Sequence, residues 1–223
     1  MTILDPLSIS TADVTGGNRR EEILGVACDL FFSKGFGAAS MRDIADQIGF
    51  TQAAIYYHFR SKDEILFAII DDFTLKLHQL LSRVMHETRD PVRDLENTIR
   101  EHILVTRTHY REIKLVIEDK KLLAEAFAER ARRQELMIYD LYRSRVAELA
   151  ASGLCKPVDP AVATFTILAA INFIYQWYRS SGALSLDEIA QQTVRMLTGG
   201  LIVEAPVRDG RKREAAGKRA KRS

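Results

Sequence analysis

Apolar residues recur at helical spacing along most of this 223-residue chain. Four of them share one face of the first expected helix, over about 18–34: Ile23, Ala27, Leu30 and Phe31. Further helices are expected over about 63–81, 91–110, 112–118, 122–151, 160–180 and 185–203. No stretch combines strand-like alternation with hairpin turns, so the pattern predicts an all-α fold.

The stretch between Ser40 and Glu64 restarts its helices unusually often. The expected N-caps are Ser40, Thr51 and Ser61, with a carboxylate three residues later in Asp43 and Glu64, which predicts a capping box at both places. The first short helix is expected to end at Gly49, and the second is barely two turns long. Two short helices joined by a glycine turn predict a helix-turn-helix, in which the second helix lies in the DNA major groove.

Residues at the start of that second helix are the candidates for contacting base edges. Gln52 offers a bidentate hydrogen bond to adenine, while Ala53 and Ala54 offer methyl contact to thymine. The candidates for the sugar-phosphate walls are Thr51, Tyr56, Tyr57, His58 and Lys62. Arg42, on the preceding helix, is expected to reach a phosphate or a guanine. For Tyr56, Ile55 and Phe59 the alternative is that they fill the small core of the domain.

Composition restricts the setting of these helices. With 47% hydrophobic and 28% charged residues, the chain is typical of globular proteins and long enough for one large core or two linked cores. Its two cysteines, Cys28 and Cys155, form neither a C-x-x-C pair nor a disulfide framework, which favours buried thiols in a cytoplasmic protein. No signal peptide is recognisable at the start, and the leader over 1–18 is expected to be disordered.

Charge is unevenly distributed. The stretch from Arg208 to Ser223 carries eight basic and two acidic side chains, so its net charge of +6 leaves −4 for residues 1–207 of a chain whose total is +2. We expect a basic, disordered tail over 205–223. Such a tail adds salt-sensitive attraction to phosphate or is simply solvated.

The most apolar segment begins at Ala161. Four polar residues interrupt it: Thr164, Thr166, Asn172 and Gln176. An isolated membrane span tolerates these poorly, so we expect a buried helix and no membrane partner.

The stretch "SMRDIADQIGFTQAAIYYHFRSKDEIL" resembles the TetR (tetracycline-repressor-like) family of transcriptional regulators. The matching positions are Phe32, Gly35, Phe36, Arg42, Asp43, Ile44, Ala45, Gly49, Tyr56, His58, Phe59, Ser61, Lys62 and Leu66. The motif covers about residues 19–70, and the remainder resembles the family in its helical layout and length.

The resemblance implies a homodimeric regulator, most often a repressor, that binds a palindromic operator in double-stranded DNA and is released by a small-molecule effector. It implies a helix-turn-helix domain over 19–65 and an effector-binding and dimerisation domain over 66–204. The last two helices, over about 160–180 and 185–203, are expected to form a four-helix bundle with those of the second subunit.

The string "WYRSSGALSLDEIA" from Trp177 resembles family members that regulate lipid and acyl-CoA degradation. An acyl-CoA thioester would need an apolar cavity and cations for its phosphates. The candidate effector-binding residues are Arg130, Arg133, Asn172, Gln176, Trp177 and Arg179, with Arg132, Arg143 and Arg145 as further cations. Alternatively, these arginines belong to a charged surface, and Asn172 and Gln176 bond across the dimer or face the cavity.

Two other classes of function are considered. An enzyme is disfavoured because the sequence has no nucleophile elbow, phosphate-binding glycine loop or H-E-x-x-H motif, and no catalytic residue or cofactor is expected. His102 and His109 are the best candidates for a metal site, but nothing fixes further ligands, so no metal is expected. A helical adaptor, the second alternative, would not need the exposed residues between Gln52 and Lys62.

Overall fold

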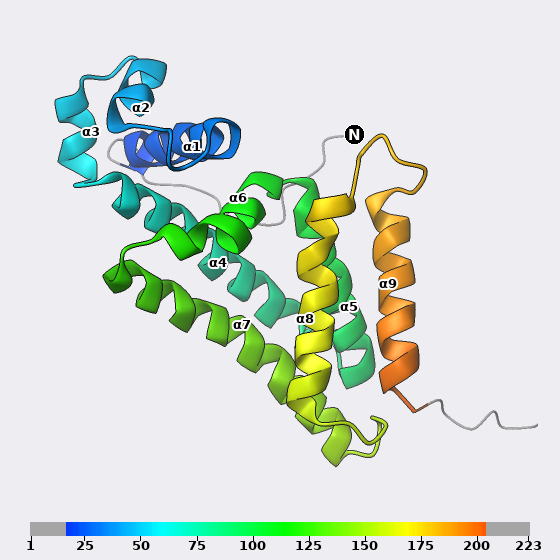
Figure 1. Ribbon diagram of the computed structural model, residues 1–223. Coiled ribbons are helices and arrows are strands. Elements are labelled where there is room, and N and C mark those ends of the chain that lie inside the picture. Colours follow the sequence, from blue (N-terminus) through cyan, green and yellow to red (C-terminus); the bar gives the residue numbers. More distant parts are fainter. Residues whose placement is uncertain (1–16, 204–223) are drawn as a thin grey trace, which may run out of the picture.

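The computed structural model describes residues 17–203, which are arranged as helices without a named strand (Figure 1). The expected basic tail and residues 1–16 of the expected leader lie outside the described residues. Gly17 and Asn18, assigned to the leader, already belong to the first helix. Within the described part, Cys155 and Ile202 form one isolated β-bridge. The predicted all-α fold is confirmed.

Three helices and the start of a fourth form the N-terminal head. They are α1 (Gly17–Lys34), α2 (Met41–Ile48), α3 (Gln52–His58) and α4 (Lys62–Val84). Their core is one cluster that includes Phe31, Ile44, Ile55 and Phe59. Ile55 and Phe59 are almost fully buried, as expected for core residues.

The remaining helices form the C-terminal domain. They are α5 (Pro91–Leu104), α6 (Tyr110–Lys114), α7 (Glu125–Ala151), α8 (Pro160–Trp177) and α9 (Leu186–Leu201). Asp90 and Asp159 cap α5 and α8 ahead of a proline at the first helical position, and Ser185 with Glu188 forms a capping box on α9.

The segment between α5 and α7 differs from the sequence-based expectation. In place of helices reaching about residue 110 and covering 112–118, a 3₁₀ turn follows α5 and a π-helical turn, Leu115–Asp119, follows α6. Leu115 and Leu123, on either side of a further 3₁₀ turn, are buried in the core of the head. The chain therefore departs from regular helix where it must bury side chains of one domain in the core of the other.

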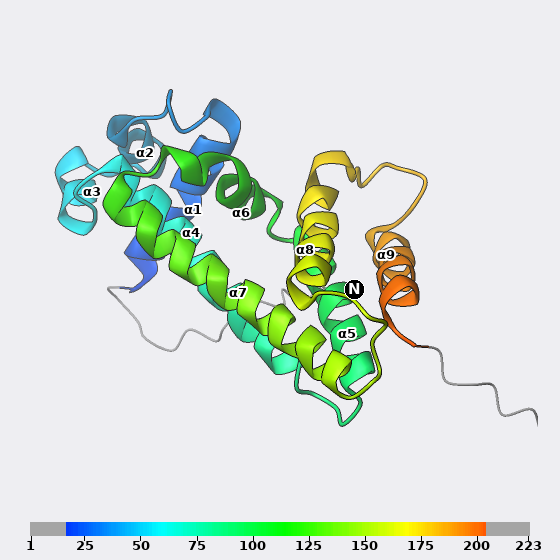
Figure 2. The same ribbon diagram turned by 60° about the horizontal axis from the view of Figure 1, so that its bottom comes forward.

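Helix α4 connects the two cores. Its first half, from Ile65 to Ile70, packs in the head, and its second half, from Phe73 to Met85, packs in the C-terminal cluster. Helix α7 runs beside α4, whereas α5, α8 and α9 lie together at the far end (Figures 1 and 2). The head and the C-terminal domain thus share one long helix and a continuous set of packed residues.

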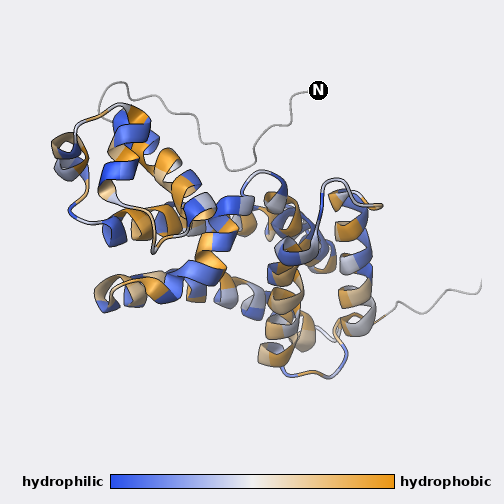
Figure 3. Ribbon diagram, turned by 45° about the horizontal axis from the view of Figure 1, so that its top comes forward, coloured by the Kyte–Doolittle hydropathy of each residue, from blue (hydrophilic) through white to orange (hydrophobic). Residues whose placement is uncertain are grey.

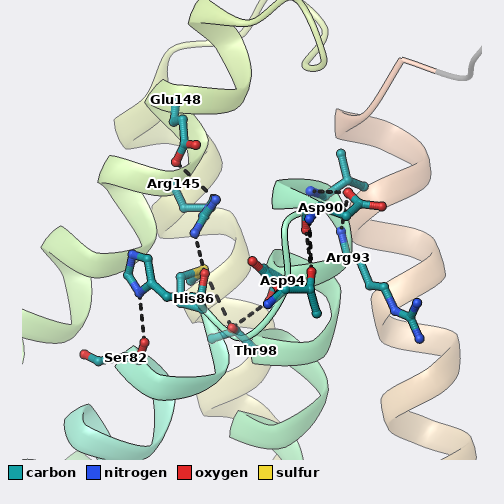
Figure 4. A network of polar contacts seen from close by, with 11 residues as sticks. Ser82, His86, Asp90, Arg93, Asp94, Thr98, Arg145 and Glu148 are labelled. Atoms are coloured by element: carbon teal, nitrogen blue, oxygen red, sulfur yellow. Dashed lines mark hydrogen bonds and ion pairs between the residues drawn. The ribbon is translucent and has the colours of Figure 1, made fainter.

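Arg145 of α7 holds the end of α4 in place (Figure 4). Its buried guanidinium donates to the main-chain oxygen of Met85 and lies 3.1 Å from a carboxylate oxygen of Glu148. Arg145, one of the cations considered for the effector, is therefore engaged in closing the α4–α5 turn.

Candidate nucleic-acid interface and ligand cavity

Helix α2 begins with the expected capping box. The Asp43 amide donates to Ser40 Oγ at 3.1 Å, and the Ser40 amide donates to Asp43 Oδ2 at 2.8 Å. Lys34, at the end of α1, lies 2.9 Å from the same carboxylate. Hydrogen bonds from Ser40, then that from Lys34, lower the pKa of Asp43 to about 2. One carboxylate thus joins the end of α1 to the start of α2.

Gly49 sets the angle between α2 and α3. Its φ of 79° lies in the left-handed region, and its neighbour Phe50 donates its amide to Ala45 O at 2.9 Å. Thr51 then caps α3 by accepting from the Ala54 amide at 3.2 Å. The two expected N-caps and the glycine turn are therefore present, and they fix the direction of α3.

Helix α3 presents a polar and aromatic face to solvent. Tyr57 is 86% exposed, and Tyr56 is 52% exposed, so Tyr56 is not a core residue. Thr51, Gln52 and Ala53 are also exposed. Ala54 and His58 are half-buried, and the rings of Tyr57 and His58 lie edge to face at 5.1 Å. The candidates for base and phosphate contact thus lie on and beside one accessible helix face.

The two candidate cations of the head have different environments. Arg42 is exposed on α2, with Asp46 at 3.5 Å as its ion-pair partner. Lys62 is half-buried, and its Nζ donates to Phe36 O at 2.6 Å and Ala39 O at 2.9 Å, above the Phe36 ring. Lys62 therefore satisfies carbonyls of the α1–α2 loop, a structural role that its expected phosphate contact did not include.

The expected capping box at the start of α4 is only half formed. Ser61 Oγ accepts from the Glu64 amide at 3.1 Å, but the Glu64 carboxylate accepts from the Arg60 amide, at 2.6 Å, instead of the Ser61 amide. The box prediction for this pair is wrong by one residue, because the extended backbone at Ser61 presents the preceding amide to the carboxylate.

The C-terminal domain encloses a cavity of about 640 Å³ between α4, α5, α7, α8 and the irregular segment around α6. Most of its lining is apolar: Phe73, Leu77, Val105, Ile113, Val116, Ile117, Leu136, Ile138, Phe165, Leu168, Ala169 and Ile171. Its polar lining is Thr74, His102, Thr106, Lys120, Arg132, Glu135, Tyr139 and Asn172. The size and the few polar groups suit an apolar organic ligand.

His102 is a buried polar group of this wall. Its Nδ1 lies 3.2 Å from Tyr142 Oη, which donates to Thr98 O at 3.4 Å. Burial lowers the pKa of His102 to about 4 and raises that of Tyr142. Both groups are therefore neutral near pH 7. Within residues 17–203 there is no cluster of three or more histidine, cysteine or acidic residues that would hold a metal ion.

The charged groups of the cavity lie where its lining reaches solvent. Lys120 and Glu135 form an ion pair, each with its side chain about one-third exposed, and Arg132 is exposed nearby on α7. Arg132 and Lys120 are thus the cations that the cavity offers to an anionic ligand.

Of the six candidate effector-binding residues, only Asn172 is among the lining residues of this cavity. Arg130 lies over the Phe67 ring at 4.5 Å, and Arg133 pairs with Glu129 at 3.1 Å on the surface of α7. The other three lie near the end of α8: Gln176, which donates to Tyr175 Oη, Trp177, which is half-exposed, and Arg179, which donates to main-chain oxygens of α8. The run of arginines contains a cavity residue, but it is Arg132, which sequence spacing alone did not distinguish from its neighbours.

Helix α8 exposes an apolar face opposite the one that packs on α7. Val162, Phe165, Phe173 and Trp177 are each more than half exposed, and Met196 on α9 is 79% exposed. Figure 3 shows the predominantly apolar colouring of α8. Among the described helices, Pro160–Trp177 is the one that reaches the length and hydropathy of a membrane span, a test that a core helix also passes.

The fold and these sites define a helix-turn-helix protein with a separate cavity-containing helical domain. A family model described as "Bacterial regulatory proteins, tetR family" matches residues 23–69, and one described as "Tetracyclin repressor-like, C-terminal domain" matches residues 88–201. The chain belongs to the TetR family of bacterial transcriptional regulators, so the resemblance is confirmed.

Individual relatives cover most of the chain. A TetR/AcrR-family regulator from Thermobifida fusca is 34% identical with a TM-score of 0.69, over 82% of this chain and 98% of that one. AibR, solved in complex with isovaleryl coenzyme A and operator DNA, is 29% identical with a TM-score of 0.73, over 80% of this chain and 97% of that one. The transcriptional repressor KstR2 of Mycolicibacterium smegmatis is 24% identical over 82% of this chain and 91% of its own.

Proposed function

We propose that this protein is a cytoplasmic, homodimeric repressor that binds a palindromic operator and leaves it when an acyl-CoA thioester binds. The observation that carries the DNA-binding part is the exposed face of α3, where Gln52 and Tyr57 project from a head whose other large side chains are mostly packed. Core packing does not require an 86% exposed tyrosine there, but contact with a sugar-phosphate wall does.

The exposed apolar face of α8 supports the homodimer. Phe165 and Phe173 lie eight residues apart on this helix and thus on one face, with Met196 exposed on α9. A second copy of α8 and α9 would cover this face as a four-helix bundle. The two heads would then meet half-sites about 34–36 Å apart, or a multiple of that distance, on one side of the duplex.

The cavity supports an acyl-CoA effector of the kind that the AibR complex contains. Its apolar interior suits an acyl group, and Lys120 and Arg132, at its solvent-exposed part, suit the phosphates of coenzyme A. The similarity to KstR2 and AibR favours a regulator of lipid degradation. A TetR-family regulator with a non-CoA effector is the second candidate.

The irregular segment around α6 supports a coupling between cavity and head. Val116 of the π-helical turn lines the cavity and packs against both cores. Glu118 in the same turn accepts from Tyr175 Oη of α8 at 2.8 Å. On the head side, Arg111 of α6 pairs with Asp29 of α1 at 2.6 Å. A ligand that displaced this segment would change the packing of the head.

The DNA-binding proposal is tested by selecting binding sites from a random duplex library. We expect a palindromic site, and we expect Gln52→Ala to lower base discrimination at one position per half-site by about 1–3 kcal/mol. Tyr57→Ala should weaken binding to all sequences, whereas Gln79→Ala, an exposed change on α4 away from the head, should change neither property. Selection of no sequence, or equal binding by all variants, would contradict the proposal.

The effector proposal is tested by a thermal-shift screen of short, medium, branched and ring-containing acyl-CoA thioesters against the free acids and free CoA. A selective ligand at a hundredfold excess over its dissociation constant adds about 2.7 kcal/mol to the unfolding free energy. Its addition should also release the selected DNA. Silence across the panel would exclude the thioesters and leave the DNA-binding proposal untouched.

A further inference from the structure

Thr74 brings an unpartnered hydroxyl group to the cavity wall. It is 2% exposed, and its Oγ1 is buried without a hydrogen-bond partner among the described residues. Three other buried threonines on helices donate to the carbonyl four residues earlier: Thr98 to Asp94 O at 2.7 Å, Thr164 to Pro160 O at 2.7 Å and Thr198 to Val194 O at 2.9 Å. Thr74 does not follow this pattern, although it also lies within a helix.

The surroundings of Thr74 provide no substitute partner. Its neighbours in the lining along α4 are Phe73 and Leu77, both apolar. A buried hydroxyl without a partner destabilises the protein, and a hydrogen bond from a bound ligand removes that penalty. The free protein thus holds a polar group whose partner is best supplied from inside the cavity.

His102 adds a second polar position to the same cavity. Because Tyr142 donates its hydroxyl hydrogen to Thr98 O, it accepts from His102 Nδ1, and the neutral ring then carries a lone pair on Nε2. The lining therefore offers a hydroxyl that donates or accepts and an imidazole nitrogen that accepts.

We propose that the cavity selects a ligand whose apolar body carries an oxygen substituent, a ketone or a hydroxyl, that hydrogen-bonds to Thr74 Oγ1. The inference builds on the proposed effector cavity and adds that the acyl part is oxygenated and not a plain hydrocarbon. A site with an unpaired buried polar group discriminates strongly against ligands that lack the matching group.

The first experiment compares cyclohexanecarboxyl-CoA with its 4-oxo and 4-hydroxy derivatives by calorimetry. We expect the wild-type protein to prefer an oxygenated thioester by about tenfold or more, and Thr74→Val to reduce this preference to about twofold or less. Thr74→Ser, which keeps the hydroxyl, should keep the preference. Thr164→Val, a matched buried threonine whose hydroxyl already has a partner outside the cavity, should keep it too.

A second set of probes separates this inference from the acyl-CoA proposal. They are 4-tert-butylcyclohexanol, 4-tert-butylcyclohexanone and tert-butylcyclohexane, compared by ligand-observed NMR with the same variants. If the thioesters do not bind but the oxygenated neutral probes show a Thr74-dependent preference, the CoA proposal fails and the inference holds. Equal binding of oxygenated and plain probes, as expected if ordered water satisfies Thr74, overturns the inference, as does the absence of binding in both sets.

The unliganded protein gives an independent result. Thr74→Val should raise the midpoint of thermal unfolding by about 2–4 °C, because it removes an unpaired hydroxyl at nearly constant volume. Thr164→Val should lower it, because its hydroxyl is bonded. A lower midpoint for Thr74→Val would mean that the hydroxyl already has a partner and would overturn the inference.

Discussion

The head and the C-terminal domain obtain their geometry in different ways. In the head, contacts between residues close in sequence fix each short helix, as in the bonds between Ser40 and Asp43 and the left-handed turn at Gly49. In the C-terminal domain, the cavity is bounded by residues far apart in sequence, from Phe73 on α4 to Asn172 on α8. Changes in the head should therefore alter one surface, whereas changes around the cavity should alter packing between several helices.

The largest expected effect separates the buried and exposed faces of α3. Phe59→Ala removes a nearly fully buried ring from the core of the head and should lower the unfolding free energy by about 3–5 kcal/mol. Tyr57→Ala, on the exposed face, should change it by no more than about 0.5 kcal/mol while weakening DNA binding. Denaturant unfolding and DNA titration measure both, and a strongly destabilised Tyr57→Ala protein would contradict this division of the helix.

The second effect concerns pH and the cavity domain. The pKa of His102 is about 4 in the folded protein, below its ordinary value of 6.5, because burial disfavours the charged ring. As pH falls from about 6.5 to about 4, the unfolded chain takes up a proton that the folded chain does not, so stability is lost on acidification.

This loss should amount to about 3 kcal/mol for His102 across that window. Denaturant unfolding of wild type and His102→Gln at several pH values isolates the contribution, since the variant lacks the titrating ring. Parallel stability curves for the two proteins between pH 7 and pH 4 would mean that His102 is accessible to solvent.

These differences explain what the sequence predicted well. Helix caps and glycine turns are local, so the positions of α2 and α3 follow from residues such as Ser40, Gly49 and Thr51. The half-formed box at Ser61 shows the limit of this approach, because the backbone conformation decides which amide Glu64 contacts.

The cavity was less predictable because its lining depends on packing across the domain. Arg130, Arg132 and Arg133 have equivalent sequence contexts, yet only Arg132 lines the cavity. The π-helical turn at Leu115–Asp119 depends on a residue that packs into the other core, and helical periodicity does not reveal it. The polar residue Thr74 carries no sequence signal, since only the structure shows that its hydroxyl has no partner.

A third prediction concerns Lys62, whose expected role was a phosphate contact. Lys62→Met keeps the packing on Phe36 but leaves the oxygens of Phe36 and Ala39 without their donor, and should lower stability by about 1–2 kcal/mol. Because its ammonium donors are already used, we expect the salt dependence of DNA binding to stay unchanged. A slope of log K against log[salt] smaller by about one unit would instead establish the phosphate contact.

The smallest effect compares one backbone conformation in the two regions. Gly49 follows α2 with φ 79°, and Gly153 follows α7 with φ 69°, and an added Cβ meets no atom within 4 Å at either position. Gly49→Ala and Gly153→Ala should therefore each lower stability by about 1 kcal/mol, through backbone strain alone.

Their effects on DNA binding should differ. Relaxation of the strain at Gly49 would tilt α3 relative to α2 and weaken operator binding, whereas relaxation at Gly153 lies in the turn after α7, at the end of the chain's C-terminal domain. Denaturant unfolding and titration with the selected DNA test the pair. Equal losses of DNA affinity in both variants would show that the turn at Gly49 has no special role in orienting α3, and that the head responds to strain anywhere in the molecule.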